Sequence, residues 1–235
     1  MSEGAMSTGS LKTADLLQTA GRQETRARTW DVGSAEGWSP QNFARQQIRG
    51  LVRQIFFSSP ARSVGQVVFA SVEPETDVRN ICRQVGDALA LESAGSVAVV
   101  GEYPQVLRDT DTCQAAIDGS MPLRQIATRL RGNVWLVPAA ANGGVSTASL
   151  HKHLGTIRRE FDYSIVAAPP AAESGEAAAM AQFADGIILV LSARHTRRVT
   201  ALRMKQILEA GQAHLLGTVL SDRVFPIPEP IYRRL

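Results

Sequence analysis

The residues of this sequence that stand where a phosphate group is commonly bound are 72–79, VEPETDVR. They follow a short apolar segment, 67–70, and precede apolar residues at helical spacing, which are Val78, Ile81, Val85 and Leu89. A first strand, tight loop and helix of this kind is where a phosphate-binding loop, G-x-x-x-x-G-K-[ST], normally lies. The position of the loop therefore indicates nucleotide chemistry, and the residue types decide whether that chemistry is present.

The residues of this loop lack the groups that bind phosphate in such a loop. Val72 and Asp77 stand at the two glycine positions, Val78 at the lysine and Arg79 at the hydroxyl residue that would hold Mg²⁺. Glycines let main-chain N–H groups approach phosphate oxygens, and the lysine supplies positive charge. A carboxylate about 4 Å from a phosphate oxygen instead costs ~1 kcal/mol in water and more in a closed site. The loop therefore predicts the fold of a nucleotide-binding protein without the residues that bind phosphate and Mg²⁺.

The elements around this loop alternate along the chain. Six apolar segments read as strands, and helical patterns separate most of them, including amphipathic or alanine-rich stretches at 42–57, 147–161, 174–183 and 197–210. Strands that are apolar on both faces are typical of a parallel sheet with helices on both sides. We therefore predict an α/β fold with a doubly wound, mainly parallel sheet, whose strands lie at 67–70, 96–100, 133–138, 163–168, 186–192 and 215–220. Residues 122–130 read as a further short helix. The residues predicted to be buried are Val67, Val68, Val99, Val100, Ile165, Val166, Ile188 and Val190.

Composition places limits on the domains and on the partners. Residues 1–40 are rich in small and polar residues and are expected to form a flexible tail, and 41–235 to form one α/β domain. The net charge of +3 is too small to indicate nucleic-acid binding. Cys82 and Cys113 lack the spacing of a motif, and Cys82 is expected to be a reduced core residue. No apolar run spans a membrane and the N-terminus lacks a signal-peptide pattern, so a cytoplasmic location is expected.

Two basic surfaces are candidates for contact with a partner. The helix at 42–57 carries Arg45, Arg49 and Arg53 beside its apolar residues, and either lies on the sheet with solvated arginines or forms a contact surface. Arg197 and Arg198 belong to a second basic cluster, 194–205, which is either a solvated helix start or faces an acidic partner or phospholipid. His151 and His153 point away from each other on a helix, so no metal site is expected.

Beyond these local patterns, four segments of the chain resemble the sequences of a known family. They occur in the order found in the bacterial tyrosine autokinases of capsule and exopolysaccharide synthesis. The four segments are RGLVRQIFFSSP, FDYSIVAAPP, FADGIILVLSARHTRRV and LEAGQAHLLGTVLSDRV. These kinases belong to the deviant-Walker P-loop ATPases, together with the Min and Par proteins. The resemblance extends from about residue 46 to the end and implies the P-loop NTPase-like fold.

The catalytic positions that this resemblance implies are mostly replaced. Glycines of the family loop fall on Glu75 and Asp77, its lysine on Val78, and its Ser-Thr pair on Arg79 and Asn80. The other losses are the two aspartates of an acidic motif at Gly101 and Tyr103, a third aspartate at Ala167, the base-contacting asparagine at Ser221, and all of the C-terminal tyrosine cluster except Tyr232. Phosphoryl transfer depends on positioning and charge neutralisation, so these losses predict a degenerate, inactive site.

The self-assembly helix of the family is altered in the same way. Its E-x-x-R-x-x-R pattern falls on Gln46, Arg49 and Val52, and the last arginine has moved to Arg53. A shift of one residue turns a side chain by ~100° around a helix, so Arg53 cannot replace Val52 in the same contact. We therefore expect a weakened homo-oligomeric interface beside a surviving apolar ridge, whose residues are Ile48, Leu51, Val52 and Ile55.

The sequence thus favours a non-catalytic, pseudokinase-like accessory or regulatory protein in exopolysaccharide or capsule synthesis and export. Its expected partner is a membrane chain-length or export protein, or an active kinase homologue, and that partner would hold it at the inner face of the membrane. The candidate interaction surface is Arg49, Arg53, Arg197 and Arg198. No cofactor and no nucleic acid are expected. The alternative is a divergent tyrosine autokinase or ATPase that still binds nucleotide through the altered site, and a partition ATPase is disfavoured because that role needs a nucleotide cycle.

Overall fold

The computed structural model describes residues 40–58, 64–101, 115, 120–139 and 146–222. Every described residue belongs to one compact unit. The predicted tail, Cys113 and Tyr232 lie outside the described residues, so the predicted boundary between tail and domain stays a prediction.

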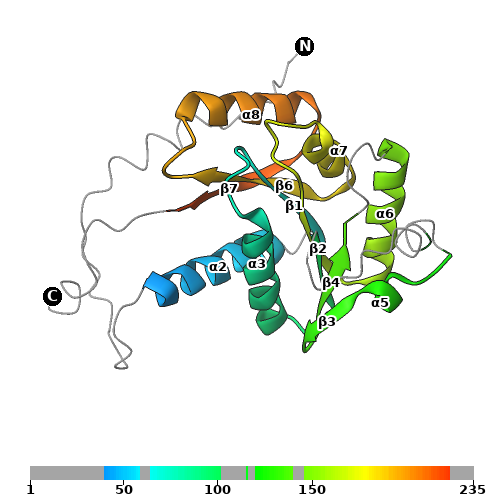
Figure 1. Ribbon diagram of the computed structural model, residues 1–235. Helices are drawn as coiled ribbons and strands as arrows, with labels where there is room; N and C mark the ends of the chain where they lie inside the picture. The colour runs from blue at the N-terminus through cyan, green and yellow to red at the C-terminus, as the bar shows by residue number, and fades with distance from the viewer. Residues whose placement is uncertain (1–39, 59–63, 102–114, 116–119, 140–145, 223–235) are drawn as a thin grey trace, which may run out of the picture. The chain divides into compact units, whose positions relative to one another are not determined.

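The described residues form a seven-stranded sheet at the centre of the domain (Figure 1). Its strand order is β3-β4-β2-β5-β1-β6-β7, and every neighbouring pair is parallel except β3 and β4. The strands are β1 (Gln66–Ser71), β2 (Val97–Gly101), β3 (Thr128–Arg131), β4 (Val134–Pro138), β5 (Tyr163–Ala167), β6 (Gly186–Ser192) and β7 (Leu215–Ser221). The predicted doubly wound, mainly parallel sheet is confirmed.

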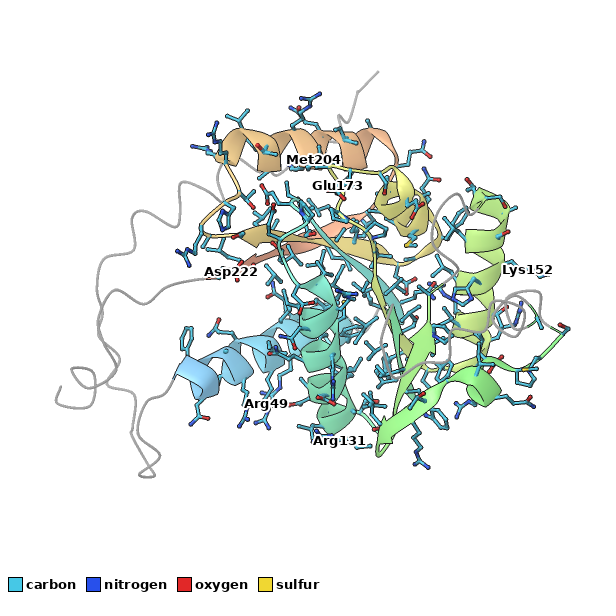
Figure 2. All side chains as sticks on the ribbon, in the orientation of Figure 1. Arg49, Arg131, Lys152, Glu173, Met204 and Asp222 are labelled. Atoms are coloured by element: carbon cyan, nitrogen blue, oxygen red, sulfur yellow. The ribbon has the colours of Figure 1, made fainter. Side chains whose placement is uncertain are left out.

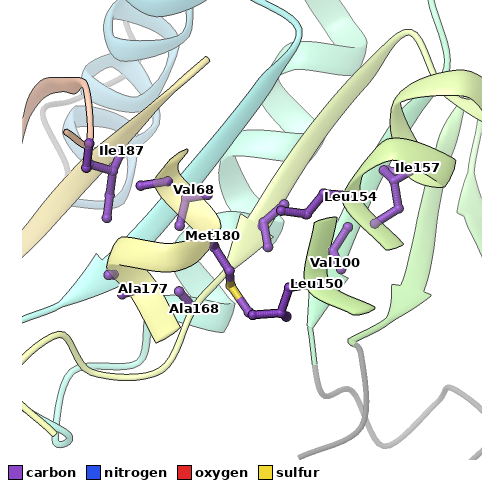
Figure 3. Close-up of a cluster of buried hydrophobic side chains, with 14 of the residues drawn as sticks. Val68, Val100, Leu150, Leu154, Ile157, Ala168, Ala177, Met180 and Ile187 are labelled. Atoms are coloured by element: carbon purple, nitrogen blue, oxygen red, sulfur yellow. The ribbon is translucent and has the colours of Figure 1, made fainter. Parts of the chain in front are cut away.

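Helices cover both faces of the sheet. On one face α2 and α3 pack over a cluster that includes Phe69, Val99 and Ile165, and on the other α6, α7 and α8 cover a second cluster, part of which Figure 3 shows. The helices are α2 (Pro40–Phe56), α3 (Val78–Glu92), α5 (Leu123–Ile126), α6 (Thr147–Glu160), α7 (Glu176–Phe183) and α8 (Arg198–Ala210). All eight side chains that the sequence predicted to be buried are buried, and so is Cys82.

The short strand β3 is an element that the sequence analysis missed. The predicted helix at 122–130 is wrong beyond Ile126, because residues 128–131 turn into an antiparallel partner of β4. Gly132 makes the tight turn with a φ of 52°, a conformation that glycine adopts without a steric cost. Arg124 and Arg129 both lie over the ring of Trp135, at 5.3 and 5.5 Å from its centroid, and these contacts favour the hairpin.

None of the helices in the described part of the chain is both long and apolar enough to cross a bilayer.

Candidate functional site

The crevice where this type of sheet binds ligands lies at the carboxyl ends of β1 and β5. These two strands are neighbours, and the helices that follow them, α3 and α7, cover opposite faces of the sheet. The connections therefore leave the sheet toward opposite faces at this point, which is the position of the ligand-binding edge in other open α/β sheets. The loop at 72–77 follows β1, and residues 168–175 follow β5.

A side chain of the preceding loop caps the N-terminus of α3. Asp77 is the N-cap residue, and its Oδ1 accepts a hydrogen bond from the main-chain N–H of Asn80 at 3.1 Å. Helix N-termini attract anions because their first N–H groups lack partners. Here a carboxylate already satisfies one of these groups and adds negative charge at the same position. Val78, at the position of the lysine, is the first helical residue and is buried.

Hydrogen bonds to β6 and to the segments that follow β6 and β5 hold this loop and the end of β1 in place. The hydroxyl of Thr196 donates to Oε2 of Glu73 and accepts a bond from the N–H of Ser192 at 2.8 Å. Val72 donates its N–H to the carbonyl of Val190 at 3.2 Å. On the other side, the N–H of Ala171 donates to the carbonyl of Ser71 at 2.8 Å. The loop is therefore tied to the segments that follow both β6 and β5.

Thr76 has a buried hydroxyl in the same loop. Its Oγ1 has no hydrogen-bond partner among the described residues, although its carbonyl accepts the N–H of Val78 at 2.9 Å. An unpaired buried hydroxyl costs free energy, so it is a position where a bound polar group would be favoured.

The structure brings the other predicted positions to the same edge of the sheet. Gly101, Ala167 and Ser221 are the last residues of β2, β5 and β7. Gly101 is buried, and its carbonyl accepts the N–H of Ala139 at 3.2 Å, while the Ser221 hydroxyl donates to the carbonyl of Leu191 at 3.3 Å. Glu75, Arg79 and Asn80 are exposed. Glu102 and Tyr103 lie outside the described residues.

On α2 the structure separates the arginines from the apolar ridge. Arg49 is exposed (Figure 2), and Arg53 forms an ion pair with Glu92 at the end of α3, with 2.9 Å between Nη2 and Oε1. The expectation of an available ridge is wrong for Val52, which is completely buried, whereas Ile48, Leu51 and Ile55 are half-buried against the cluster under α2 and α3. The arginine-bearing side of α2 is exposed, and Leu51 and Ile55 line a pocket beside β6 and β7.

The second basic surface lies at the start of α8. Arg197 is the N-cap residue without a side-chain capping bond, Arg198 is the first helical residue, and both are exposed. The first turn of α8 contains no acidic residue. Positive charge at a helix N-terminus is unfavourable, so an anionic group of a partner would stabilise this region.

The histidines of α6 do not form a metal site with the residues that the structure describes. The ring of His151 lies 4.5 Å from that of Phe183, whereas His153 is buried and its Nε2 is 3.2 Å from the carbonyl oxygen of Pro138. Burial lowers the pKa of His153 to about 4, against the opposing effect of the Pro138 carbonyl, so its ring is neutral at pH 7. The described ranges hold no cluster of three potential metal ligands.

The sequence analysis also missed a set of carboxylates at the opposite edge of the sheet. Asp185 accepts the N–H groups of Gly65 and Gln66, each at 2.8 Å, and pairs with Arg158. Burial alone would raise the pKa of Asp185, but these hydrogen bonds and the Arg158 charge outweigh it and lower the pKa below its ordinary value. Its only signal in the sequence is an aspartate directly before a strand.

Comparison with known proteins places the fold. A scan against protein-family models found no match, and no curated protein sequence is significantly similar. Among solved structures, the chimerical protein CapA2B2 superposes with a TM-score of 0.62 at 15% identity, covering 74% of this chain and 83% of that one. The kinase domain of the Escherichia coli tyrosine kinase ETK gives 0.62 at 14% identity, covering 86% and 88%. The MinD cell division protein of Aquifex aeolicus gives 0.54 at 19%, covering 66% and 68%. The chain therefore has the P-loop NTPase-like fold that bacterial tyrosine kinase domains and MinD share.

Proposed function

We propose that this protein is a non-catalytic accessory or regulatory protein of bacterial exopolysaccharide or capsule assembly, which acts by binding other proteins. The observation that carries the proposal is the hydrogen bond from the Asn80 N–H to Asp77, at the place where a kinase of this fold would bind phosphate. The buried Val78 and the absence of carboxylates at Gly101 and Ala167 support it, since they leave neither a phosphate cation nor a metal ligand at these positions.

The binding partner in this proposal is a membrane chain-length or export protein, or an active kinase homologue. Such a partner would keep the protein at the inner face of the membrane. Contact would use Arg49, Arg53, Arg197 and Arg198, which are all exposed and would meet an acidic surface. The altered pattern at Gln46 and Val52 would weaken self-assembly, so the protein alone would be a monomer or a dimer.

Two charge reversals with a matched control test this proposal. Arg49→Glu and Arg198→Glu are each expected to weaken binding to the cytoplasmic part of the chain-length protein, or to the kinase homologue, at least tenfold in biolayer interferometry. Arg131→Glu makes the same charge change on the exposed end of β3 and is expected to bind like the unmodified protein. Absence of binding to both proteins, or an equal loss in all three variants, would contradict the proposal.

The second candidate function is a divergent enzyme that binds nucleotide through the altered site. The buried hydroxyl of Thr76 favours it, because this group has no hydrogen-bond partner in the described ranges. Thr76→Val would then weaken nucleotide binding, whereas under the first proposal it leaves partner binding unchanged. Transfer of radiolabel from γ-labelled ATP to protein, or release of labelled phosphate, would establish this second function in place of the first.

A further inference from the structure

The outer edge of β7 presents main-chain groups that no described strand binds. β7 is the last of the described strands in the sheet order. The N–H of Ala193, which follows β6, donates to the carbonyl of Ser221 at 2.9 Å, so the main-chain groups of Ser221 point toward β6. Because these groups alternate along a strand, those of Val219 also point toward β6, and those of Thr218 and Leu220 point away from the sheet.

The side chain of Leu220 adds an apolar surface to this edge. Val219 packs against the cluster under α2 and α3, so Leu220 lies on the opposite face of the sheet, where it is 59% exposed. On that face α8 contacts β7 and exposes Leu202 and Ile207. A strand edge with exposed apolar side chains invites pairing with another strand, and proteins usually cover it.

The sequence that follows β7 has the pattern of an edge strand. Residues 225–231 are FPIPEPI, so Pro226, Pro228 and Pro230 alternate with four residues that keep their N–H groups. In an extended strand, alternate N–H groups point to the same side, so this segment has N–H donors along one side and none along the other. Prolines in sheets occur on edge strands in this orientation, with the side that lacks donors facing solvent.

The geometry at the end of β7 allows the chain to return along the strand. Asp222, labelled in Figure 2, follows β7 and has a φ of 56°, a left-handed conformation that aspartate adopts in turns more readily than most residues. β7 has seven residues and is ~23 Å long at ~3.3 Å per residue, and residues 223–231 span up to ~30 Å when extended. The segment is therefore long enough to cover the edge.

We propose that residues 225–231 pair antiparallel with β7 and form the outermost strand of the sheet. The residues with N–H groups, which are Phe225, Ile227, Glu229 and Ile231, face the strand and bind Thr218 and Leu220. Residues that lie opposite each other share a face, so the apolar side chains of this set cover Leu220. The nitrogen atoms of the three prolines then lie along the outer side of the strand, where they offer no N–H donors. The sheet therefore cannot be extended by a further strand or by a second copy of the chain.

Amide hydrogen exchange measured by NMR tests this pairing in the full chain. The amides of Thr218 and Leu220 are expected to be protected at least tenfold more than in a chain that ends at Asp222. The amides of Val219 and Ser221 face β6 and should stay protected in both, which shows that the domain remains folded. Equal exchange of Thr218 and Leu220 in the two chains would overturn the proposal, and so would protection that depends on protein concentration, since that would assign the edge to a second copy.

A full-length variant with the same composition and shifted prolines tests the pattern itself. Exchanging residues within the pairs 225/226, 227/228 and 229/230 moves every proline to the side that faces β7. Protection of Thr218 and Leu220 is then expected to be lost. The control exchanges Phe225 with Ile227, keeps the prolines in place and is expected to retain the protection. Retained protection in the shifted variant would overturn the proposed orientation.

Discussion

At the amino-terminal edge of the sheet, Asp162 and Asp185 each lie between a helix and the strand that follows it, whereas at the carboxyl edge Glu73 and Asp77 lie between β1 and α3. Both pairs accept hydrogen bonds, but their partners differ. Asp162 binds the N–H and hydroxyl of Ser96 before β2, and Asp185 binds two N–H groups at the start of β1. At the carboxyl edge, the partners are a helix N-terminus and the hydroxyl of Thr196.

The difference shows what a carboxylate does at each edge of an open α/β sheet. At the amino-terminal edge no ligand is expected, and the acids satisfy N–H groups that join neighbouring segments. At the carboxyl edge the bond to Asp77 uses an N–H group at a helix N-terminus, a donor that a phosphate-binding protein would reserve for its ligand. One kind of interaction therefore supports the fold at one edge and opposes anion binding at the other.

The largest expected effect is the loss of the acceptor at Asp185. Asp185→Ala removes the partner of two main-chain N–H groups and of Arg158, and it should lower the free energy of unfolding by ~3 kcal/mol. Asp185→Asn keeps an acceptor oxygen and should cost ~1 kcal/mol. Urea unfolding of both variants measures the difference, and equal, small losses would show that this edge does not depend on the aspartate.

The pH dependence of the free energy of unfolding should show whether the negative charge of Asp185 stabilises this edge. The lowered pKa of Asp185 means that its stabilising contribution is present above the unfolded value, ~3.9, and is lost as the pH falls through the lower folded pKa. The stability difference between the unmodified protein and Asp185→Asn should therefore be constant above pH ~5 and shrink in more acid solution. A difference that grows on acidification would contradict the assignment.

A smaller effect is expected at the carboxyl edge when the helix cap is removed. Asp77→Ala leaves the N–H of Asn80 without its acceptor and should cost ~1 kcal/mol, whereas Asp77→Gly should cost only a few tenths because glycine is tolerated at this position. Thermal unfolding compares the two variants. A loss as large as that of Asp185→Ala would mean that the two edges contribute equally to stability.

The smallest effect is expected at Glu73. Glu73→Gln keeps an oxygen that accepts the Thr196 hydroxyl, so the free energy of unfolding should change by less than ~0.5 kcal/mol. Glu73→Ala is the matched comparison and should cost ~1 kcal/mol, since the hydroxyl then loses its acceptor. If the glutamine variant is as unstable as the alanine variant, the negative charge itself holds the loop.

Much of the fold was predictable because its strands are continuous apolar segments. Strands β1 and β6 are buried on both faces of the sheet, with Val68 in the cluster on one face and Ile188 in the cluster on the other, and this burial leaves a continuous apolar pattern in the sequence. The exposed residues of β3 gave no such pattern, and Leu123 and Ile126 matched a helical spacing that ends sooner than expected.

The position of the candidate site was also predictable, but its contacts were not. The strand–loop–helix at 66–91 indicated where the site lies, because this depends on chain order. The bonds between Asp77 and Asn80 and between Glu73 and Thr196 depend on rotamers and on loops that meet in space. Val52 was misjudged for a similar reason, since a helical pattern identifies an apolar side but not what covers it.

The most direct test of the central claim is calorimetric titration of the full-length protein with ATP and Mg²⁺. Because Asp77 occupies the start of α3 and Val78 replaces the phosphate-binding cation, we predict no saturable binding at nucleotide concentrations up to ~1 mM, which corresponds to a binding free energy weaker than about −4 kcal/mol. Saturable binding with a micromolar Kd would contradict the claim and identify the protein as a nucleotide-binding enzyme of altered chemistry.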